Sequence, residues 1–519
     1  MINFSELKLI KVKEPKDNFV GIRKSKTGND FEFCLPNGFQ DFPEGDFDKI
    51  RELFFKMYRT FRKFERDNKG TNRFQINKPQ YQQEQDQTNI YSGGLSLVNE
   101  QGEACVIYSK LKMIERVLEA YDDLAINSIH KKIRKTGEID YSQIYKYLDR
   151  AIYLDNDVIY VEAMALSGSV VLFDSDAIVK LYCYILDEVV QQLDGDVPEN
   201  IQAHRNEIRG LSQCFKDGYL TNNQSIFDKS SYAETISILK EILEKIDKNT
   251  HYKDAGYWGL YEAVETFLYG ELKADEENGE YWGVKGFSLV WEDICHTYFF
   301  KKFSDAICFA DADITLENYS NAVRQTREQN RVGNYLYSSN IKSYANRWIY
   351  SDKSHIPYPK KPGFFRWHEL LCIELDTQQG TLIFSNRNYD DFNQRDRSQA
   401  KRRFPCPDLI LKHESEDNYD LYIIDYKDVP IDFYYKNWNK PLETTDDKFR
   451  IDIIKQLTYE LALQQTNQVK ISKSWFIIPN YLDNSTYQSV LCNTKINIKG
   501  IQVVQADFFI LQKKYLGEN

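Results

Sequence analysis

The sequence predicts an α/β protein: a C-terminal region with a mixed sheet flanked by helices, preceded by a small β-containing region and a mostly helical domain. The C-terminal part has two short apolar strands around a polar turn, with helical segments on either side and a further strand beyond. Helix, hairpin, helix and strand in that order are typical of a mixed α/β core. The middle of the chain instead has the 3.6-residue periodicity of helices, and the start contains strand-like alternation. These observations divide the chain into 1–105, 106–275 and 281–519.

The first region, 1–105, is expected to be β-rich with one helix. Strand-like alternation around 20–23 and 31–35 is interrupted by a turn signal at 27–30. Residues 46–69 combine basic and aromatic side chains at helical spacing. We interpret them as an amphipathic helix with a solvated face rather than as a nucleic-acid platform.

The second region, 106–275, is expected to be helical, because apolar side chains recur three and four residues apart. Two such stripes belong to core faces: Leu111, Ile114, Val117, Leu118, Tyr121 and Leu124, and further on Ile236, Leu239, Leu243 and Ile246. An acidic stretch ending in Asn278 and Gly279 has the composition of a linker.

The third region, 281–519, contains the candidate catalytic residues. It begins with a helix near 287–295 and is interrupted by a polar insertion at about 303–400. The hairpin follows, then a helix near 447–466 and strands near 474–479 and 501–504. This region is therefore expected to fold as the mixed α/β core.

Composition limits the class of protein. A chain of 519 residues is too long for one ordinary core, so about two to four domains are expected. With 42% hydrophobic and 28% charged residues it is globular, and it has neither an apolar run long enough to span a bilayer nor a secretory signal pattern at its start. The nine cysteines include no Cys-x-x-Cys pair, which argues against a zinc module and a disulfide framework. We expect a cytoplasmic protein with no membrane partner.

The net charge of −11 disfavours nonspecific adhesion to nucleic acid, because such binding depends on many Lys and Arg contacts with phosphates. One local exception is the basic stretch Arg395, Arg397, Lys401, Arg402 and Arg403. A solvated loop is the simpler interpretation of a basic cluster. Its position directly upstream of the hairpin nevertheless favours contacts with DNA phosphates.

The hairpin places three reactive groups together. Asp408 begins its first strand, and Asp425 and Lys427 stand two residues apart at the end of its second. Because side chains alternate faces along a strand, Asp425 and Lys427 point the same way, and the carboxylate of Asp408 can meet that of Asp425. Two carboxylates that bind Mg²⁺ and one ammonium group suffice to hydrolyse a phosphodiester.

Chance matches must be considered, because acid-x-Lys patterns are frequent in a chain this charged. Glu6 with Lys8 and Glu271 with Lys273 are examples, and neither ends an apolar strand that follows a Pro-Asp dipeptide. That dipeptide occurs once, at 407–408. The pattern on the hairpin therefore favours a nuclease site as a hypothesis.

These residues resemble the signature of the PD-(D/E)xK nuclease superfamily, whose core carries the metal carboxylates on a hairpin and a further Glu on a preceding helix. Glu292, after Trp291, matches that helical position. More closely, the chain resembles the LlaJI-type restriction endonuclease family, which is related to McrC-like nuclease subunits. The stretches that carry this second resemblance are 108–111, 139–144, 147–154, 267–272 and the helix around Glu292.

The resemblance implies a nuclease subunit of a restriction system that cuts double-stranded DNA with Mg²⁺, for which Mn²⁺ is a possible substitute. It also implies a partner, an McrB-like AAA+ GTPase that binds DNA, docked on the N-terminal β and helical portions, and an associated DNA methyltransferase. The chain has no Gly-x-x-x-x-Gly-Lys-Ser/Thr loop, so GTP is expected to act only through the partner.

Roles follow for five residues. Asp408, Asp425 and Glu292 are expected to hold the metal, Lys427 to orient the attacking water and to offset charge on the phosphorane, and Gln456 to position the lysine or the DNA. On residue pattern alone, a surface acid of an amphipathic helix is the favoured interpretation of Glu292.

Other residues near the hairpin are ranked lower. Glu369 and Glu374 compete with Glu292 for the same role, Tyr459 is interpreted as packing, and His413 as structural. Two alternative functions stay open: a catalytically idle scaffolding subunit on a nuclease fold, and a DNA-repair exonuclease on the same core.

Overall fold

The structure of the chain is a computed structural model. The residues that the structure describes are 3–12, 19–25, 31–68, 75–76, 95–98, 104–108, 111–122, 126, 133–139, 148, 151–153, 159–160, 168–172, 176–221, 224–250, 253–270, 282–303, 306–310, 312–315, 331–333, 348–349, 373–376, 381–384, 402–403, 407–414, 419–467, 470–482 and 489–518. Most of the predicted insertion at about 303–400 lies outside these residues.

Two compact units make up the chain. The smaller unit comprises Met1–Asn3 and Lys110–Lys273, and the larger comprises Phe4–Ser109 and Ala274–Asn519. The larger unit thus draws on both ends of the chain. The boundaries predicted near 105 and 275 themselves stay predictions.

The larger unit contains a seven-stranded sheet in the order β1-β3-β2-β11-β6-β5-β4. Its strands are β1 (Lys8–Ile10), β2 (Phe19–Lys24), β3 (Phe31–Cys34), β4 (Gln75–Ile76), β5 (Leu95–Val98), β6 (Ala104–Tyr108) and β11 (Trp282–Lys285). Gly21 and Gly283 lie directly opposite each other in β2 and β11, both at positive φ. A Cβ on Gly21 would meet the Trp282 carbonyl oxygen at 2.2 Å, so this close approach of two strands requires glycine.

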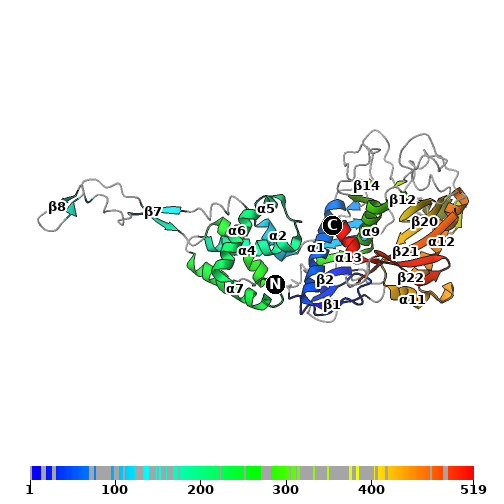
Figure 1. Ribbon diagram of the computed structural model, residues 1–519, viewed down its shortest axis with the longest axis horizontal. Helices are drawn as coiled ribbons and strands as arrows, with labels where there is room; N and C mark the ends of the chain where they lie inside the picture. The colour runs from blue at the N-terminus through cyan, green and yellow to red at the C-terminus, as the bar shows by residue number, and fades with distance from the viewer. Residues whose placement is uncertain are drawn as a thin grey trace, which may run out of the picture. The chain divides into compact units, whose positions relative to one another are not determined.

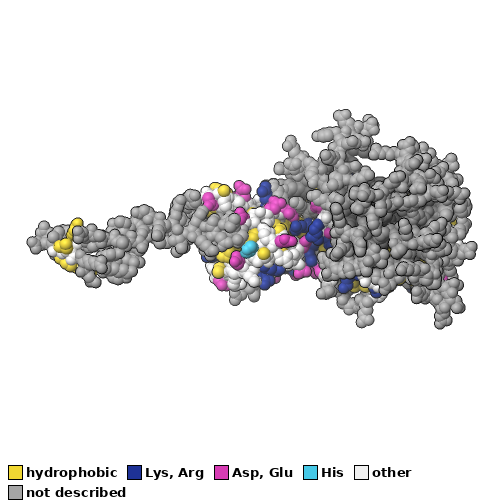
Figure 2. Space-filling model, turned by 90° about the horizontal axis from the view of Figure 1, so that it is seen from above, with side chains coloured by type: hydrophobic (Ala, Val, Ile, Leu, Met, Phe, Trp, Pro, Cys, Tyr) yellow, Lys and Arg dark blue, Asp and Glu magenta, His cyan; other side chains and the backbone are white. Residues whose placement is uncertain are grey.

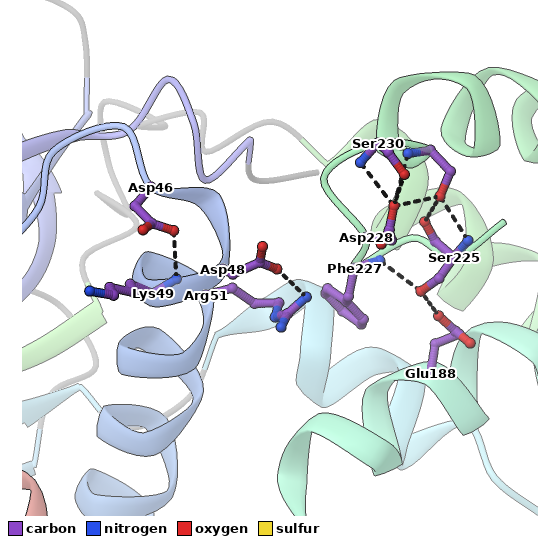
Figure 3. A network of polar contacts seen from close by, with 10 residues as sticks. Asp46, Asp48, Lys49, Arg51, Glu188, Ser225, Phe227, Asp228 and Ser230 are labelled. Carbon is purple, nitrogen blue, oxygen red and sulfur yellow. Dashed lines mark hydrogen bonds and ion pairs between the residues drawn. The ribbon is translucent and has the colours of Figure 1, made fainter. Parts of the chain in front are cut away.

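Helix α1 (Phe47–Asn68) packs its apolar face on this sheet. The Trp282 ring, fully buried, contacts Phe54, Tyr58 and Phe61 of the helix. The Asp46 carboxylate accepts a hydrogen bond from the Lys49 backbone N–H at 3.2 Å and so satisfies one of the free donors of the first turn (Figure 3). The amphipathic helix expected at 46–69 is therefore present, with several of its aromatic side chains in the core.

The second seven-stranded sheet of the larger unit has the order β15-β12-β19-β20-β21-β23-β22. Its strands β12, β20, β21 and β22 are labelled in Figure 1. Its strands are β12 (Ile307–Ala310), β15 (Trp348–Ile349), β19 (Leu409–Glu414), β20 (Tyr419–Tyr426), β21 (Lys470–Asn480), β22 (Leu491–Ile498) and β23 (Ile501–Asp507). β19 pairs antiparallel with both β12 and β20, whereas β21 pairs parallel with both β20 and β23. The expectation of an α/β protein with mixed sheets is confirmed.

Helices cover this sheet. They are α9 (Ser288–Phe303), α11 (Ile431–Asn437), α12 (Asp447–Asn467) and α13 (Phe508–Leu516). α12 packs against β20 and β21, and α9 against β20 and α13. The buried Tyr426 ring lies edge-on to His296 of α9, at 4.9 Å between centroids. Since neighbouring side chains of a strand point to opposite faces, Asp425 lies on the face of β20 opposite to the Tyr426 ring.

A loop between β3 and α1 docks on the end of the second sheet. The Tyr481 N–H donates to the Gly38 carbonyl at 2.9 Å, and Asn37 Nδ2 donates to Asp428 Oδ1 at 2.8 Å. Gly38 has φ +81°, and a Cβ there would lie 2.0 Å from the Pro479 carbonyl oxygen. The loop therefore fits closely against the backbone just beyond Lys427.

The smaller unit is mainly helical. Its helices are α2 (Lys112–Glu119), α4 (Asp176–Leu193), α5 (Glu199–Ala203), α6 (Arg205–Tyr219), α7 (Tyr232–Asn249) and α8 (Ala255–Tyr269), and its strand pairs are β7 (Ile133–Ile139) with β10 (Gly168–Leu172) and β8 (Ile152–Tyr153) with β9 (Ile159–Tyr160). The predicted apolar stripe on α7 is buried at Ile236, Leu239, Leu243 and Ile246.

A polar network orders the turn before α7. Ser225 Oγ donates to Glu188 of α4 and accepts from the Phe227 N–H at 3.1 Å, and Asp228 accepts from the Ser230 N–H at 2.8 Å (Figure 3). Hydrogen bonds from Ser230 lower the pKa of Asp228 below its usual value. These bonds satisfy backbone donors that the turn leaves without helix partners, and we interpret the network as structural.

The described surface seen in Figure 2 intersperses acidic, basic and apolar side chains. The overall charge of −11 itself disfavours nonspecific binding to DNA. No helix in the described part of the chain combines the length and apolarity needed to cross a membrane.

Candidate active site

The hairpin of β19 and β20 brings Asp408 and Asp425 together. Leu409 pairs with Ile424 in the antiparallel register, so the residue before β19 stands opposite Asp425. Asp408 Oδ2 accepts a hydrogen bond from the Tyr426 backbone N–H at 2.6 Å, which locks the start of one strand to the end of the other. The structure thus places Asp408 and Asp425 opposite each other at one end of the hairpin, and their role stays a prediction.

The pKa of Asp408 reflects burial and the neighbouring charged groups. Burial raises the pKa of Asp408 well above its usual value, and the carboxylates of Asp425 and Glu292 raise it further, whereas Lys427 lowers it. Asp425 also hydrogen-bonds to Asp408, so it is the nearer acid. Like charges in such proximity disfavour joint ionisation unless a proton or a cation is shared. Glu292, on α9, contributes to the raised pKa of Asp408, and its role as a metal or water ligand stays a prediction.

Lys427 follows β20 directly and is held by two carboxylates. Its Nζ lies 2.6 Å from Asp425 Oδ2 and 3.3 Å from Asp452 Oδ1, and 5.5 Å from the centre of the Phe476 ring. Burial opposes the charge, but Asp425 and Asp452 overcome this and raise the pKa of Lys427 well above its usual value. The ammonium is therefore charged at neutral pH, as its expected role requires.

Asp452 was not anticipated from the sequence. It lies in the first turns of α12, and its side chain is only 10% exposed. A signal was present, since Asp452 and Gln456 are four residues apart and so share one face of a helix. That face packs against β20 and β21.

Gln456 is buried on the same face, but its observed partner is a serine. Its Nε2 donates to Ser474 Oγ of β21 at 2.8 Å, and its carbonyl oxygen has no hydrogen-bond partner among the described residues. The structure thus links Gln456 to the neighbouring strand. Its role toward Lys427 or DNA stays a prediction.

The lower-ranked residues are placed as follows. Tyr459 is buried in α12, His413 pairs with Asp420 across the hairpin, and Glu374 belongs to β16 (Ile373–Asp376). Glu369 lies outside the described residues.

The basic stretch upstream of the hairpin is described only in part. Arg402 and Arg403 form β18, which pairs with β16 in a small sheet that also contains β17 (Thr381–Phe384). Arg395, Arg397 and Lys401 lie outside the described residues. Contact of this stretch with DNA phosphates stays a prediction.

The donor set fits a hard divalent cation with few protein ligands. Among the residues that the structure describes, no group of three or more His, Cys, Asp and Glu side chains is arranged to hold a metal ion by itself. Mg²⁺, however, commonly keeps several waters and takes only one or two carboxylates. Asp408 and Asp425 supply such a pair, and their mutual repulsion is what a cation would relieve.

Comparisons with known proteins add one remote similarity. No protein-family model matches the chain, and no curated protein matches it. Among solved structures, the chain is similar to one described as a refined half-complex from a tetradecameric assembly of Thermococcus gammatolerans McrB AAA+ hexamers with bound McrC. The match has 10% sequence identity and a TM-score of 0.23, and covers 96% of this chain and 81% of that one. A TM-score this low does not establish a shared fold.

Proposed function

We propose that the chain is a Mg²⁺-dependent DNA endonuclease, the nuclease subunit of a restriction system that acts with an McrB-like AAA+ GTPase. The observation that carries this proposal is the convergence of Asp408, Asp425 and Lys427 at one end of a hairpin. A hairpin with a purely structural role has no need for two adjoining buried carboxylates, because their repulsion destabilises the fold.

The arrangement of elements supports a PD-(D/E)xK core and a kinship with LlaJI-type nucleases. α9, with Glu292, precedes β12 and the β19–β20 hairpin, and α12 then connects β20 to the parallel strand β21. Helix, strands, helix and strand occur in the order that the resemblance implies. The acidic residue on the first helix lies near the hairpin carboxylates, as expected for such a site.

Each of the four site residues would have its own role in catalysis. Asp408 and Asp425 would hold Mg²⁺, and Glu292 would complete the acidic group as a ligand of the metal or of its water. Bound Mg²⁺ would polarise the scissile phosphate and acidify a water molecule. Lys427 would place its ammonium beside the phosphate, where it orients the attacking water and offsets the charge that develops, an effect worth roughly 3–4 kcal/mol for a preorganised donor.

A partner that binds DNA fits the charge of the chain. The net charge of −11 opposes independent binding to a polyanion, so we propose that affinity is supplied by the GTPase, with the N-terminal sheet and the helical unit as the docking portion. GTP would then act only on the partner, and an associated DNA methyltransferase would protect the host DNA.

Cleavage of circular and linear plasmid with Mg²⁺ or Mn²⁺ tests the proposal, with the chain alone and with its GTPase and GTP. We expect Asp425→Asn to abolish cleavage while Asp420→Asn, which removes the same charge from the same strand but contacts Ser472, keeps it. Cutting that survives Asp425→Asn would refute the assignment. Degradation from the ends of linear DNA alone would favour an exonuclease, and no cutting in any combination would favour an idle scaffold.

A further inference from the structure

The Lys427 ammonium occupies an oxygen that the proposed metal would use. Its Nζ lies 2.6 Å from Asp425 Oδ2, whereas the cation would have to bind the same carboxylate. An ammonium and a divalent cation cannot both sit against one oxygen at contact distance, because both carry positive charge. A cation that binds Oδ2, or that bridges both oxygens of Asp425, therefore requires Lys427 to release Oδ2.

Asp452 is placed to receive the ammonium. Its Oδ1 is already 3.3 Å from Lys427 Nζ, longer than the roughly 2.7–2.9 Å of a charge-assisted hydrogen bond. Its Oδ2 is buried and has no hydrogen-bond partner among the described residues, and the whole residue is only 7% exposed. A buried carboxylate oxygen without a hydrogen bond is costly, so a closer approach of the Lys427 ammonium to Asp452 would be favourable.

The rest of Lys427 is anchored, which limits the movement to its side chain. Its backbone N–H donates to the Ile477 carbonyl of β21 at 2.9 Å. The ammonium lies over the Phe476 ring, an attractive surface for a cation. A short displacement of Nζ from Asp425 toward Asp452 therefore needs no change in the backbone.

We infer that Asp452 is a positioning residue that takes over the Lys427 ammonium when a divalent cation binds Asp425. This inference rests on the proposed function. No proton is gained or lost: the cation replaces the ammonium on Asp425, and the ammonium keeps a carboxylate partner on α12. Asp452 thereby keeps Lys427 beside the site instead of free in solvent, and acts on DNA only through the lysine.

Calorimetric titration with Mn²⁺ at one fixed pH tests the inference without requiring cleavage. We expect Asp452→Asn to weaken Mn²⁺ binding about tenfold, a typical effect of removing a group that supports a metal ligand. Asp452→Glu, which keeps a carboxylate on the helix, should restore most of the affinity. Glu460→Gln is the matched control: it removes the same charge from the same helix, but Glu460 hydrogen-bonds to Ser474, so its effect should stay within about threefold. Thermal unfolding of each variant verifies that it is folded.

The second arm repeats the titration in a Lys427→Met background. With no ammonium to displace, Asp452→Asn should have no larger effect there than Glu460→Gln. An equal weakening with and without Lys427 would mean that Asp452 acts as a distant charge, and it would overturn the inference. So would unchanged Mn²⁺ affinity in Asp452→Asn. A wild-type chain that binds no divalent cation would instead refute the proposed metal site, and the inference with it.

Discussion

Asp408→Asn should make the protein more stable while it removes the proposed metal site. The carboxylate of Asp408 is hydrogen-bonded to that of Asp425 and has Glu292 nearby. Two like charges ~4 Å apart repel by ~4 kcal/mol at an effective dielectric constant of 20. Protonation and Lys427 already relieve part of this repulsion, so we expect the free energy of unfolding to rise by about 1–2 kcal/mol. Asparagine keeps an oxygen for the Tyr426 N–H, so that hydrogen bond is retained.

The rise in the free energy of unfolding caused by Asp408→Asn should depend on pH. Because the pKa of Asp408 is raised in the folded chain, the unfolded chain releases this proton first as the pH rises from about 4. The wild-type protein therefore loses stability as the pH rises toward the folded pKa of Asp408, whereas Asp408→Asn does not. The difference between them should be near zero at pH about 4 and largest above neutrality.

Urea denaturation at several pH values, with and without Mg²⁺, is the assay. Mg²⁺ at 100 times its dissociation constant should stabilise the wild-type protein by about 2.7 kcal/mol and the variant by much less. A variant that is equally or less stable than wild type at neutral pH would refute the repulsion on which this reasoning depends. A gain that does not change with pH would do the same.

Two further predictions concern the loop that docks beside the site. Gly38→Ala should lower the free energy of unfolding by at least about 2–3 kcal/mol in urea denaturation, because the new Cβ would meet the Pro479 carbonyl. Gly45→Ala, also at positive φ but with open space around it, should lower it by only about 1 kcal/mol, and similar losses at both positions would contradict this. Burial raises the pKa of Asp428 to about 6. Asn37→Ala removes the hydrogen bond from Asn37 to this buried carboxylate, so the free energy of unfolding should fall by about 1–3 kcal/mol at pH 8. Since Asn37 lowers that pKa, the loss should shrink as Asp428 is protonated below pH about 6, and a loss independent of pH would count against it.

The elements around the site could be predicted because their burial follows local periodicity. Leu409 and Ile424 of the hairpin are buried in the core. The register that pairs them also sets Asp408 opposite Asp425 at the ends of the two strands. α12 was expected from its length and sequence, and it begins and ends within a residue or two of the prediction. β22 was not expected, since Leu491–Ile498 is rich in polar residues and lies at the edge of its sheet. An edge strand pairs through its backbone and needs little apolar sequence.

Long-range relations could not be predicted from local pattern. The strand that contains Trp282 is short, and its sequence does not indicate that β11 pairs with both β2 and β6. The spacing of two residues between Asp425 and Lys427 predicts that their side chains lie on one face of a strand. Asp452, by contrast, meets Lys427 only because α12 packs across β20. A helix-face pattern indicates which residues are buried, but not which charge they will meet.

The pairing of β6 with β11 has a consequence for how this protein can diversify. Tyr108 and Gly283 are paired across β6 and β11 in one sheet, although Lys110–Lys273, nearly all of the helical unit, lies between them in the chain. The two points where the chain leaves and re-enters the sheet are thus about 5 Å apart. Topologically the helical unit is an insertion between adjacent strands, and a turn of a few residues can close the same gap. Its sequence and length can therefore change, or a different module can replace it, while the register of the strands that support the candidate active site stays the same.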